Sequence, residues 1–374
     1  MYSFLNLLHF VLIVQPLFFA LQLLTSKREV PVPNRVLGIS MIVISFYYLI
    51  NADFFASELP FLLYKRFYVF GVLFLINPFY YLYTKSLTTE GYKFDIKVLL
   101  HFIPSLIFLI LSLLIFLPQS PLLFSVEVFL HIVAVVYTIQ VIIYSLLMFF
   151  LLKEHNVNLK NYFSFSENIN LNWLKFFIII YVLITILDLF IFYSHNQSLR
   201  IYYYLLMIFF FNFIGYFGGQ QLIIYPNIIN NDSVNDSVND SESKDINQKN
   251  NRININETKK QLMIDIVALM DTNKMYLNNK LSIFDLSEEL RVNKTYISNV
   301  INDNFNENFN SFINRYRILE AKELIMDSNF DHLTFEAIAN KVGFNSKASF
   351  NSAFKKYTMM TPSAYKKQRL DFNT

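Results

Sequence analysis

Seven long apolar runs fill the first 225 residues, and they constrain the fold more than any other feature of the chain. One helix needs about 20 mostly apolar residues to cross the hydrocarbon core of a bilayer. The runs lie at approximately Phe4–Leu24, Val36–Ala56, Phe61–Tyr83, Val98–Leu117, Leu122–Leu152, Trp173–Tyr193 and Ile201–Tyr225. Since a helix satisfies all its backbone hydrogen bonds internally in lipid, the runs predict a seven-helix transmembrane bundle over residues 1–225.

The composition agrees with a membrane protein and narrows the chemistry. Hydrophobic residues make up 54% of the 374-residue chain and the mean hydropathy is +0.37, which is too apolar for one soluble globule. The chain has no Cys, which excludes disulfides, thiol nucleophiles and Cys-ligated metals. It also lacks the short motifs of metalloproteases and serine hydrolases. We therefore expect no enzyme activity, no metal and no cofactor.

Loop charge predicts the orientation of the bundle in the membrane. The first, third and fifth loops carry Lys27, Arg28, Arg35, Lys85, Lys93, Lys97, Lys153 and Lys160. On the other side there are only three basic residues: Arg200 in a loop, and Lys65 and Arg66 near the outer end of the third run. Cytoplasmic loops are enriched in Lys and Arg, so the odd loops are predicted to lie inside. Seven crossings of a bacterial inner membrane then put the N-terminus outside and the C-terminus in the cytoplasm.

Ionisable residues inside the apolar runs are candidate sensor residues, because a charge at membrane depth is costly without a functional role. Glu127 and His131 are one helical turn apart, and Asp188 lies within the sixth run. The alternative for Glu127 is a position near the outer end of its run. We expect a membrane sensor site at Glu127, His131 and Asp188, for an unknown small-molecule or envelope signal.

Residues 226–256 differ sharply from the segments on either side. The sequence Asn-Asp-Ser-Val occurs twice from Asn231, and Asn-Asp-Ser-Glu follows. A polar, low-complexity segment cannot bury a core, so these residues are predicted to form a disordered linker. A flexible chain of this length spans roughly 30 Å, which would keep the following domain near the membrane.

The C-terminal residues 333–369 have the pattern of two helices joined by a tight turn. Thr334 is a candidate N-cap for the first helix, and Gly343 allows a turn with positive φ. Ser346 or Asn345 would cap the second helix, which has apolar residues on one face and polar residues on the other. Between Lys341 and Arg369 there are seven basic residues and no acidic one. A helix that is polar on one side and basic at its end favours insertion into the major groove of DNA.

These landmarks resemble the DNA-binding domain of AraC/XylS-type transcription regulators. The resemblance to its second helix-turn-helix unit is carried by Gly343-Phe344, Phe350, Phe354-Lys355-Lys356 and Thr361-Pro362-Ser363-Ala364-Tyr365. Upstream, 283–290 followed by Val292-Asn293 and Tyr296-Ile297-Ser298 resembles the first unit, and Phe309 with 315–321 resembles the helix between them. The resemblance covers roughly residues 265–369, and it implies sequence-specific binding to double-stranded DNA.

Polar side chains on the two expected recognition helices are the candidates for DNA contact. Those expected to contact bases are Lys294, Thr295, Ser298, Asn299, Asn302, Ser346, Lys347, Asn351 and Ser352. Asn pairs with adenine and Lys reaches guanine, whereas basic residues farther along bind phosphates. The candidates for phosphate contact are Lys355, Lys356, Lys366, Lys367 and Arg369.

Two departures from the family pattern concern turns. Met359 and Asn306 each stand where the family usually has Gly, and Asn tolerates a left-handed backbone better than most residues. The first unit also carries several acidic residues. We therefore expect modest DNA affinity, raised by formation of a homodimer.

Together these features predict an all-α protein of three parts. They are a membrane domain at 1–225, a linker at 226–256, and a DNA-binding domain at 257–374 with core 265–369, helix-turn-helix units 283–305 and 334–357, and joining helix 309–327. The expected function is a membrane-tethered transcription regulator. The alternative is a membrane transporter or channel with a regulatory DNA-binding tail.

Overall fold

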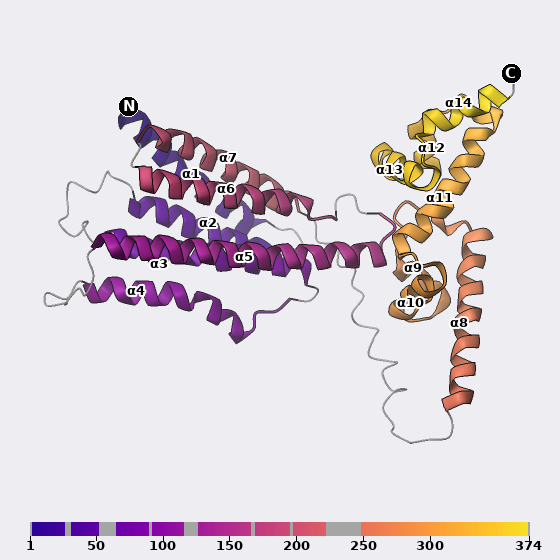
Figure 1. Ribbon diagram of the computed structural model, residues 1–374, viewed down its shortest axis with the longest axis horizontal. Coiled ribbons are helices and arrows are strands. Elements are labelled where there is room, and N and C mark those ends of the chain that lie inside the picture. Colours follow the sequence, from indigo (N-terminus) through magenta and orange to yellow (C-terminus); the bar gives the residue numbers. More distant parts are fainter. Residues whose placement is uncertain are drawn as a thin grey trace. The chain divides into compact units, whose positions relative to one another are not determined.

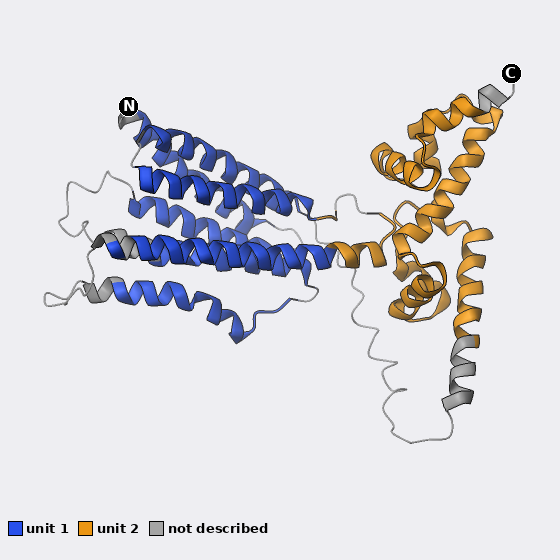
Figure 2. Ribbon diagram, in the orientation of Figure 1, with its two compact units in different colours: residues 1–155, 171–224 blue, residues 156–170, 225–374 orange. Residues whose placement is uncertain are grey.

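The computed structural model describes residues 2–26, 31–51, 65–89, 92–115, 126–165, 169–194, 197–221 and 248–372. They form two compact units: unit 1 comprises residues 1–155 and 171–224, and unit 2 comprises residues 156–170 and 225–374 (Figure 2). Among the described residues every regular element is a helix, and the one β contact is an isolated antiparallel bridge between Phe163 and Ser282. The all-α prediction is therefore confirmed for this part of the chain.

The described residues of unit 1 form seven α-helices with their long axes roughly side by side (Figure 1). They are α1 Tyr2–Thr25, α2 Pro31–Asn51, α3 Lys65–Thr88, α4 Ile103–Ile115, α5 Val126–Tyr162, α6 Asn172–Ser194 and α7 Gln197–Gln220; a 3₁₀ helix, Ile96–Phe102, precedes α4. Consecutive helices from α1 to α4 pack on one another, and α7 packs on α1, α2 and α6. The last turns of α5, from residue 156, belong to unit 2.

Within the described residues, five of these helices are long and apolar enough to cross a membrane. These segments are Phe4–Thr25, Val32–Asn51, His131–Tyr162, Asn172–Ser194 and Ser198–Gln220. Residues such as Phe18, Ile139 and Phe209 are large, apolar and exposed on the outer faces of the helices, which is the surface expected of helices in contact with lipid. Seven membrane crossings and their orientation stay predictions.

The interior of unit 1 is aromatic and contains a few polar bridges between helices. Tyr80, Phe177 and Tyr181 pack ring against ring, with centroids 4.9–5.9 Å apart. Asn77 donates to Gln140 over 3.0 Å and accepts from the Tyr181 hydroxyl over 2.6 Å, which ties α3, α5 and α6 together. Buried polar side chains are tolerated among apolar helices when they bond to one another in this way.

Unit 2 contains the C-terminal helices. They are α8 Gln248–Asp271, α9 Ile283–Leu290, α10 Lys294–Phe305, α11 Phe309–Met326, α12 Phe335–Lys341, α13 Lys347–Thr358 and α14 Pro362–Phe372, with 3₁₀ turns at Met275–Leu277 and Ser328–Phe330. Helix α8 begins at Gln248, within the segment predicted to be the linker. Residues 226–247 of that linker lie outside the described residues.

Two hydrophobic clusters lie among the described C-terminal helices of unit 2, and α11 contributes to both. Its first half, including Phe309 and Phe312, packs with Ile297 and Ile301 of α10. Its second half, including Ala321 and Ile325, packs in the cluster that contains Phe350 and Phe354 of α13. The helix pairs on the two sides of α11 therefore share one continuous helical support.

Candidate nucleic-acid interface

Two pairs of short helices, α9–α10 and α12–α13, carry the residues predicted to contact DNA. Side-chain caps fix where three of the four helices begin: Asn293 accepts from the Thr295 amide over 2.7 Å, Thr334 from Ala337 over 3.1 Å, and Ser346 from Ser349 over 3.2 Å. Each cap satisfies an amide that the first turn of a helix leaves without a partner. The structure thus confirms the predicted caps at Thr334 and Ser346, and it begins α10 at Lys294 as expected.

Each turn between paired helices contains one residue with a left-handed backbone. Arg291 has φ 54° between α9 and α10, and Gly343 has φ 92° between α12 and α13. A Cβ at Gly343 would lie 2.6 Å from the Tyr276 carbonyl oxygen and 2.9 Å from that of Leu277. Gly343 is therefore required both for its φ and for the close approach of another backbone segment.

The base-contact candidates on α10 divide into exposed and buried side chains. Thr295, Asn299 and Asn302 are exposed, and Lys294 is half-buried with its ammonium 5.2 Å from the centre of the Phe284 ring. Ser298 is only 7% exposed, contrary to the expectation that it faces outward. It lies beside Ile297 on the inward side of the helix, so it is not available for a base contact in this conformation.

The candidates on α13 form a more open row. Lys347, Asn351 and Ser352 are exposed, whereas Ser346 is half-buried because its hydroxyl caps the helix. Phe350 and Phe354 occupy the opposite, buried side. A helix with apolar anchors on one side and short polar side chains on the other can be pressed into a groove without losing its packing.

The phosphate candidates are not equally available. Lys355 and Lys367 are exposed, and Lys356 donates to the Ser311 hydroxyl over 3.1 Å. Lys366 forms an ion pair with Asp331 at 2.8 Å, so a phosphate would have to compete with that carboxylate. The side chain of Arg369 lies outside the described residues.

Sequence reasoning gave no special role to Arg317, which is 1% exposed and the largest fully buried side chain among the described residues. Its Nε donates to the Tyr276 carbonyl over 2.7 Å, and one terminal nitrogen donates to the Asn278 carbonyl over 2.7 Å. These bonds hold the loop after α8 against α11. A guanidinium with several carbonyl acceptors can be buried at tolerable cost.

Arg317 also binds residues 156–170, hereafter the connector, which links α5 to α6 in the chain. It donates to the Ser164 carbonyl over 3.2 Å and to the Ser164 hydroxyl over 2.9 Å. The Ser164 amide and hydroxyl in turn donate to the Leu281 carbonyl over 3.1 and 2.7 Å. The connector is thus hydrogen-bonded to the segment that leads into α9.

Apolar contacts extend the attachment of the connector. Leu159, Phe163 and Ile169 form a small buried cluster with Phe284 of α9 at its edge. The Phe163 and Phe284 rings lie 6.0 Å apart, and Asn310 of α11 donates to the Phe163 carbonyl over 3.1 Å. Phe284 also lies beneath the Lys294 ammonium. The connector therefore contacts the same aromatic ring as a base-contact candidate.

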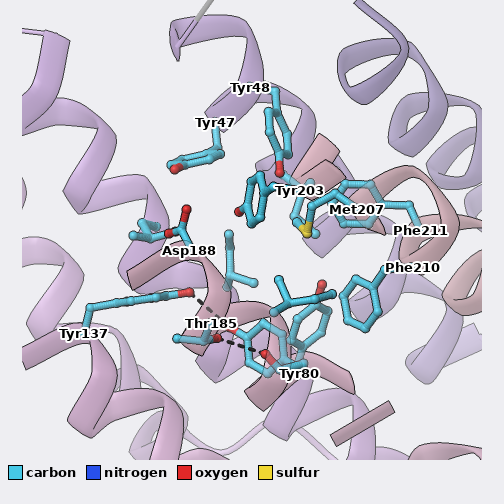
Figure 3. Close-up of a pocket in the computed structure, with 15 residues that line it drawn as sticks. Tyr47, Tyr48, Tyr80, Tyr137, Thr185, Asp188, Tyr203, Met207, Phe210 and Phe211 are labelled. Atoms are coloured by element: carbon cyan, nitrogen blue, oxygen red, sulfur yellow. Dashed lines mark hydrogen bonds between the residues drawn. The ribbon is translucent and has the colours of Figure 1, made fainter. Parts of the chain in front are cut away.

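The predicted sensor residues of the membrane helices are only partly described. The side chain of Glu127 lies outside the described residues, so its pairing with His131 stays a prediction. The His131 ring packs near Phe192 and Tyr193, at 5.8 and 5.4 Å between centroids. Asp188 lines a cavity among α2, α3, α5, α6 and α7 (Figure 3).

Known proteins resemble the C-terminal residues of this chain. Residues 286–368 match the family model of a helix-turn-helix domain. This match supports a helix-turn-helix domain of the AraC type in unit 2. The transcriptional regulatory protein HptR of Staphylococcus aureus is 34% identical over 100 residues, which are 27% of this chain and 38% of that protein. An uncharacterized response regulatory protein of Staphylococcus epidermidis is 34% identical over 95 residues, or 25% and 36% of the two chains.

Two solved structures resemble part of this chain. The C-terminal domain of the response regulator yesN from Fusobacterium nucleatum is 27% identical, with 29% of this chain and 98% of that chain covered and a TM-score of 0.25. The C-terminal domain of AraT, a response regulator from Geobacillus stearothermophilus, is 22% identical over 30% of this chain and 84% of its own, with a TM-score of 0.24. The chain spans less than two fifths of its curated relatives, at 38% of HptR.

Proposed function

We propose that this protein is a membrane-tethered transcription regulator that binds specific DNA sequences through unit 2 and responds to a signal through its apolar helices. The helix-turn-helix match over residues 286–368 and the exposed polar rows on α10 and α13 support the DNA-binding part. Five helices of sufficient length and apolarity support the membrane part. Both features occur in one chain, and this combination is the observation that carries the proposal.

Loop charge and the connector support the same orientation independently. The connector is the fifth loop, which the distribution of Lys and Arg assigns to the cytoplasm. It is also the loop whose Ser164 is hydrogen-bonded to Leu281 and Arg317 of unit 2. A loop attached to a DNA-binding domain must lie on the side of the membrane that holds DNA, so the N-terminus would be outside.

We infer that the connector carries the signal. It joins α5 and α6 covalently and touches Phe284, which lies beneath Lys294 on α10. A change in the packing of α5 and α6 would therefore move or release a segment that supports the first helix pair. Coupling of this kind needs a contact that differs between two states, and the hydrogen bonds of Ser164 are the candidates.

The roles of the DNA contacts follow from their chemistry. Asn299, Asn302 and Asn351 suit adenine, and Lys294 and Lys347 suit guanine in the major groove. Lys355, Lys356 and Lys367 suit phosphates. Two helix pairs that are supported by one helix, α11, can contact successive major grooves about 34 Å apart. Homodimer formation would add a second such pair.

A genome-wide DNA-binding profile of the full chain tests the proposal. We expect discrete enriched sites that disappear when Lys347 and Asn351 are both replaced by Ala. Lys260→Ala removes the same charge from an exposed position on α8 and should leave the sites unchanged. A profile without enriched sites in the wild-type chain would contradict the regulator function and leave the transporter alternative.

A disulfide can test the connector separately, because the chain has no Cys of its own. Phe163 and Ser282 face each other across an antiparallel bridge, where side chains lie about 4.5–5.5 Å apart at Cβ. In the variant Phe163→Cys with Ser282→Cys, oxidation should change operator affinity more than about fivefold, a coupling of ordinary allosteric size. Reduction should restore it. Equal affinity in both forms would remove the connector from the signalling route.

A further inference from the structure

An aromatic cavity lies inside unit 1, with a volume of about 50 Å³. Its wall includes Tyr47 and Tyr48 of α2, Tyr80 of α3, Tyr137 of α5 and Tyr203 of α7. By the rule that one water needs about 10–15 Å³ of such space, roughly three to five waters or a group of similar size would fit. Apolar and aromatic walls with a few polar groups are typical of small-molecule sites.

Among the described residues that line the cavity, Asp188 of α6 is the one carboxylate. Figure 3 shows the hydroxyl groups of Tyr47, Tyr137 and Tyr203 around this carboxylate. Arg200 acts on it electrostatically, but no ion pair joins Asp188 to a cation of the described chain. A carboxylate among apolar helices is stabilised by a cation.

The surrounding residues indicate the kind of cation. Calcium and magnesium need about six or more oxygen ligands, and Asp188 offers one carboxylate. Among the described residues no group of three acidic or His side chains could hold a metal ion. Tyrosine rings instead attract organic cations through the negative faces of their π systems, by about 0.5–2 kcal/mol each. An alkylammonium group also matches the size of the cavity.

We propose that this cavity binds a small organic cation, a primary or quaternary alkylammonium, whose charge is neutralised by Asp188. The role of this ligand as a signal for DNA binding rests on the function proposed above, whereas its binding to the cavity does not. The position of Asp188 favours entry from outside, since the predicted outer end of α6 at Ser194 is only about 9 Å away along the helix.

Two of the helices that form the cavity wall, α5 and α6, also belong to the proposed signalling route. Tyr137 belongs to α5, and Thr185 and Asp188 belong to α6. These are the two helices that the connector joins. A cation between them would be attracted both to the Asp188 carboxylate on α6 and to the Tyr137 ring on α5, which would draw the two helices together. The ends of the connector would follow.

Choline and 3,3-dimethyl-1-butanol provide the test, because they have nearly the same shape and differ in charge. The full chain in lipid nanodiscs would be titrated with each compound and with n-butylammonium, and binding would be measured by calorimetry. We expect at least one of the two ammonium compounds to bind at least tenfold more tightly than the alcohol. We also expect Asp188→Asn to weaken that binding at least tenfold.

Three variants keep the result interpretable. Glu154→Gln makes the same carboxyl-to-amide change at an exposed site outside the cavity and should leave binding unchanged. Tyr203→Phe keeps the aromatic wall and the Asp188 charge, so it should weaken ammonium binding less than Asp188→Asn does. Tyr80→Leu removes an aromatic wall and should weaken the ammonium more than the alcohol. Thermal unfolding of each variant checks that it is folded.

Several outcomes would overturn the proposal. They are equal binding of choline and the alcohol, full binding by a folded Asp188→Asn variant, no binding of either ammonium compound to the folded wild-type chain, or displacement of the ammonium by an equal concentration of Na⁺. The assay contains no DNA, so its failure is distinct from failure of the DNA-binding profile. Ligand binding without any enriched DNA site would retain the cavity site and remove its role as a transcriptional signal.

Discussion

Arg317 of α11 donates hydrogen bonds to both the carbonyl and the hydroxyl of Ser164, although 153 residues separate them in the chain. The same guanidinium holds the carbonyls of Tyr276 and Asn278. One buried side chain of α11 therefore hydrogen-bonds both to the loop before α9 and to the connector. Helix α11 is the helix that supports both helix pairs. Loss of either partner would leave polar groups unsatisfied, which costs more than the bond itself contributes.

Ser164→Ala should loosen the connector without unfolding the helices. The variant removes the hydroxyl that accepts from Arg317 and donates to Leu281. Since each such bond is worth about 1 kcal/mol, the amide of Ser164 should exchange with deuterium roughly five- to thirtyfold faster. Hydrogen-exchange mass spectrometry of the full chain measures this. Ser363→Ala, at an exposed site on α14, is the control, and unchanged exchange at Ser164 would refute the importance of its hydroxyl.

Gly343→Ala should destabilise unit 2. The backbone there has φ 92°, and a Cβ would lie 2.6 Å from the Tyr276 carbonyl oxygen and 3.0 Å from Arg317 Nε. Strain and displacement of these groups should together cost more than about 2 kcal/mol. Urea unfolding followed by the exchange of α13 amides would measure the loss. Gly219→Ala meets nothing within 4 Å and should have almost no effect; a comparable loss in both variants would contradict this argument.

Met359→Gly should instead stabilise the protein. Met359 ends α13 with φ 59° and its side chain is 84% exposed, so little buried surface is lost on its removal. A left-handed non-glycine residue costs about 1–2 kcal/mol, and the extra freedom of Gly in the unfolded chain returns about 0.5–1 kcal/mol of that. The expected net gain is about 0.5–1 kcal/mol. Asn306→Gly, at φ 52°, should gain less because Asn tolerates this conformation. A loss of stability at Met359 would show that its side chain has a role.

The helices of unit 2 could be predicted from sequence because their ends are determined locally. Asn293 and Thr334 accept from amides two and three residues away, and the apolar spacing along α13 fixes its buried side through Phe350 and Phe354. The resemblance to a known family identified the turns at Asn306 and Met359, and both adopt the left-handed backbone that the usual Gly would allow.

The connector could not be predicted in this way. Its hydrogen bonds join Ser164 to Leu281 and Arg317, which are far away in the chain. Local periodicity in the sequence cannot predict contacts between residues so far apart. Ser298 was misjudged for a different reason. Thr295 and Asn302, which lie about one turn away on either side of it, are exposed, but Ser298 itself lies on the inward side of α10 and is 7% exposed.

The Glu320 carboxyl should make the free energy of unfolding of unit 2 depend on pH in the acid range. Desolvation raises the pKa of its carboxyl, but hydrogen bonds from Lys274 and Tyr276 and the Lys274 charge outweigh that effect, so the pKa is lowered overall. The Lys274 ammonium donates to the two carboxylate oxygens over 3.0 and 2.9 Å, and the Tyr276 hydroxyl donates over 2.8 Å. A carboxyl whose pKa is lower in the folded state stabilises that state above its unfolded pKa of about 4.3. This stabilisation is lost as the pH falls through the folded pKa.

The acid dependence can be measured by urea unfolding of the wild type and of Glu320→Gln at a series of pH values from about 6 down to about 3.5, a range that brackets the usual pKa of a Glu carboxyl. The wild type should be more stable at the upper end, and the difference between the two proteins should shrink as the pH falls. Glu289→Gln changes an exposed carboxyl on α9 and should follow the wild type throughout. A constant difference between wild type and Glu320→Gln across the range would mean that Glu320 stabilises the fold by packing and not by its charge.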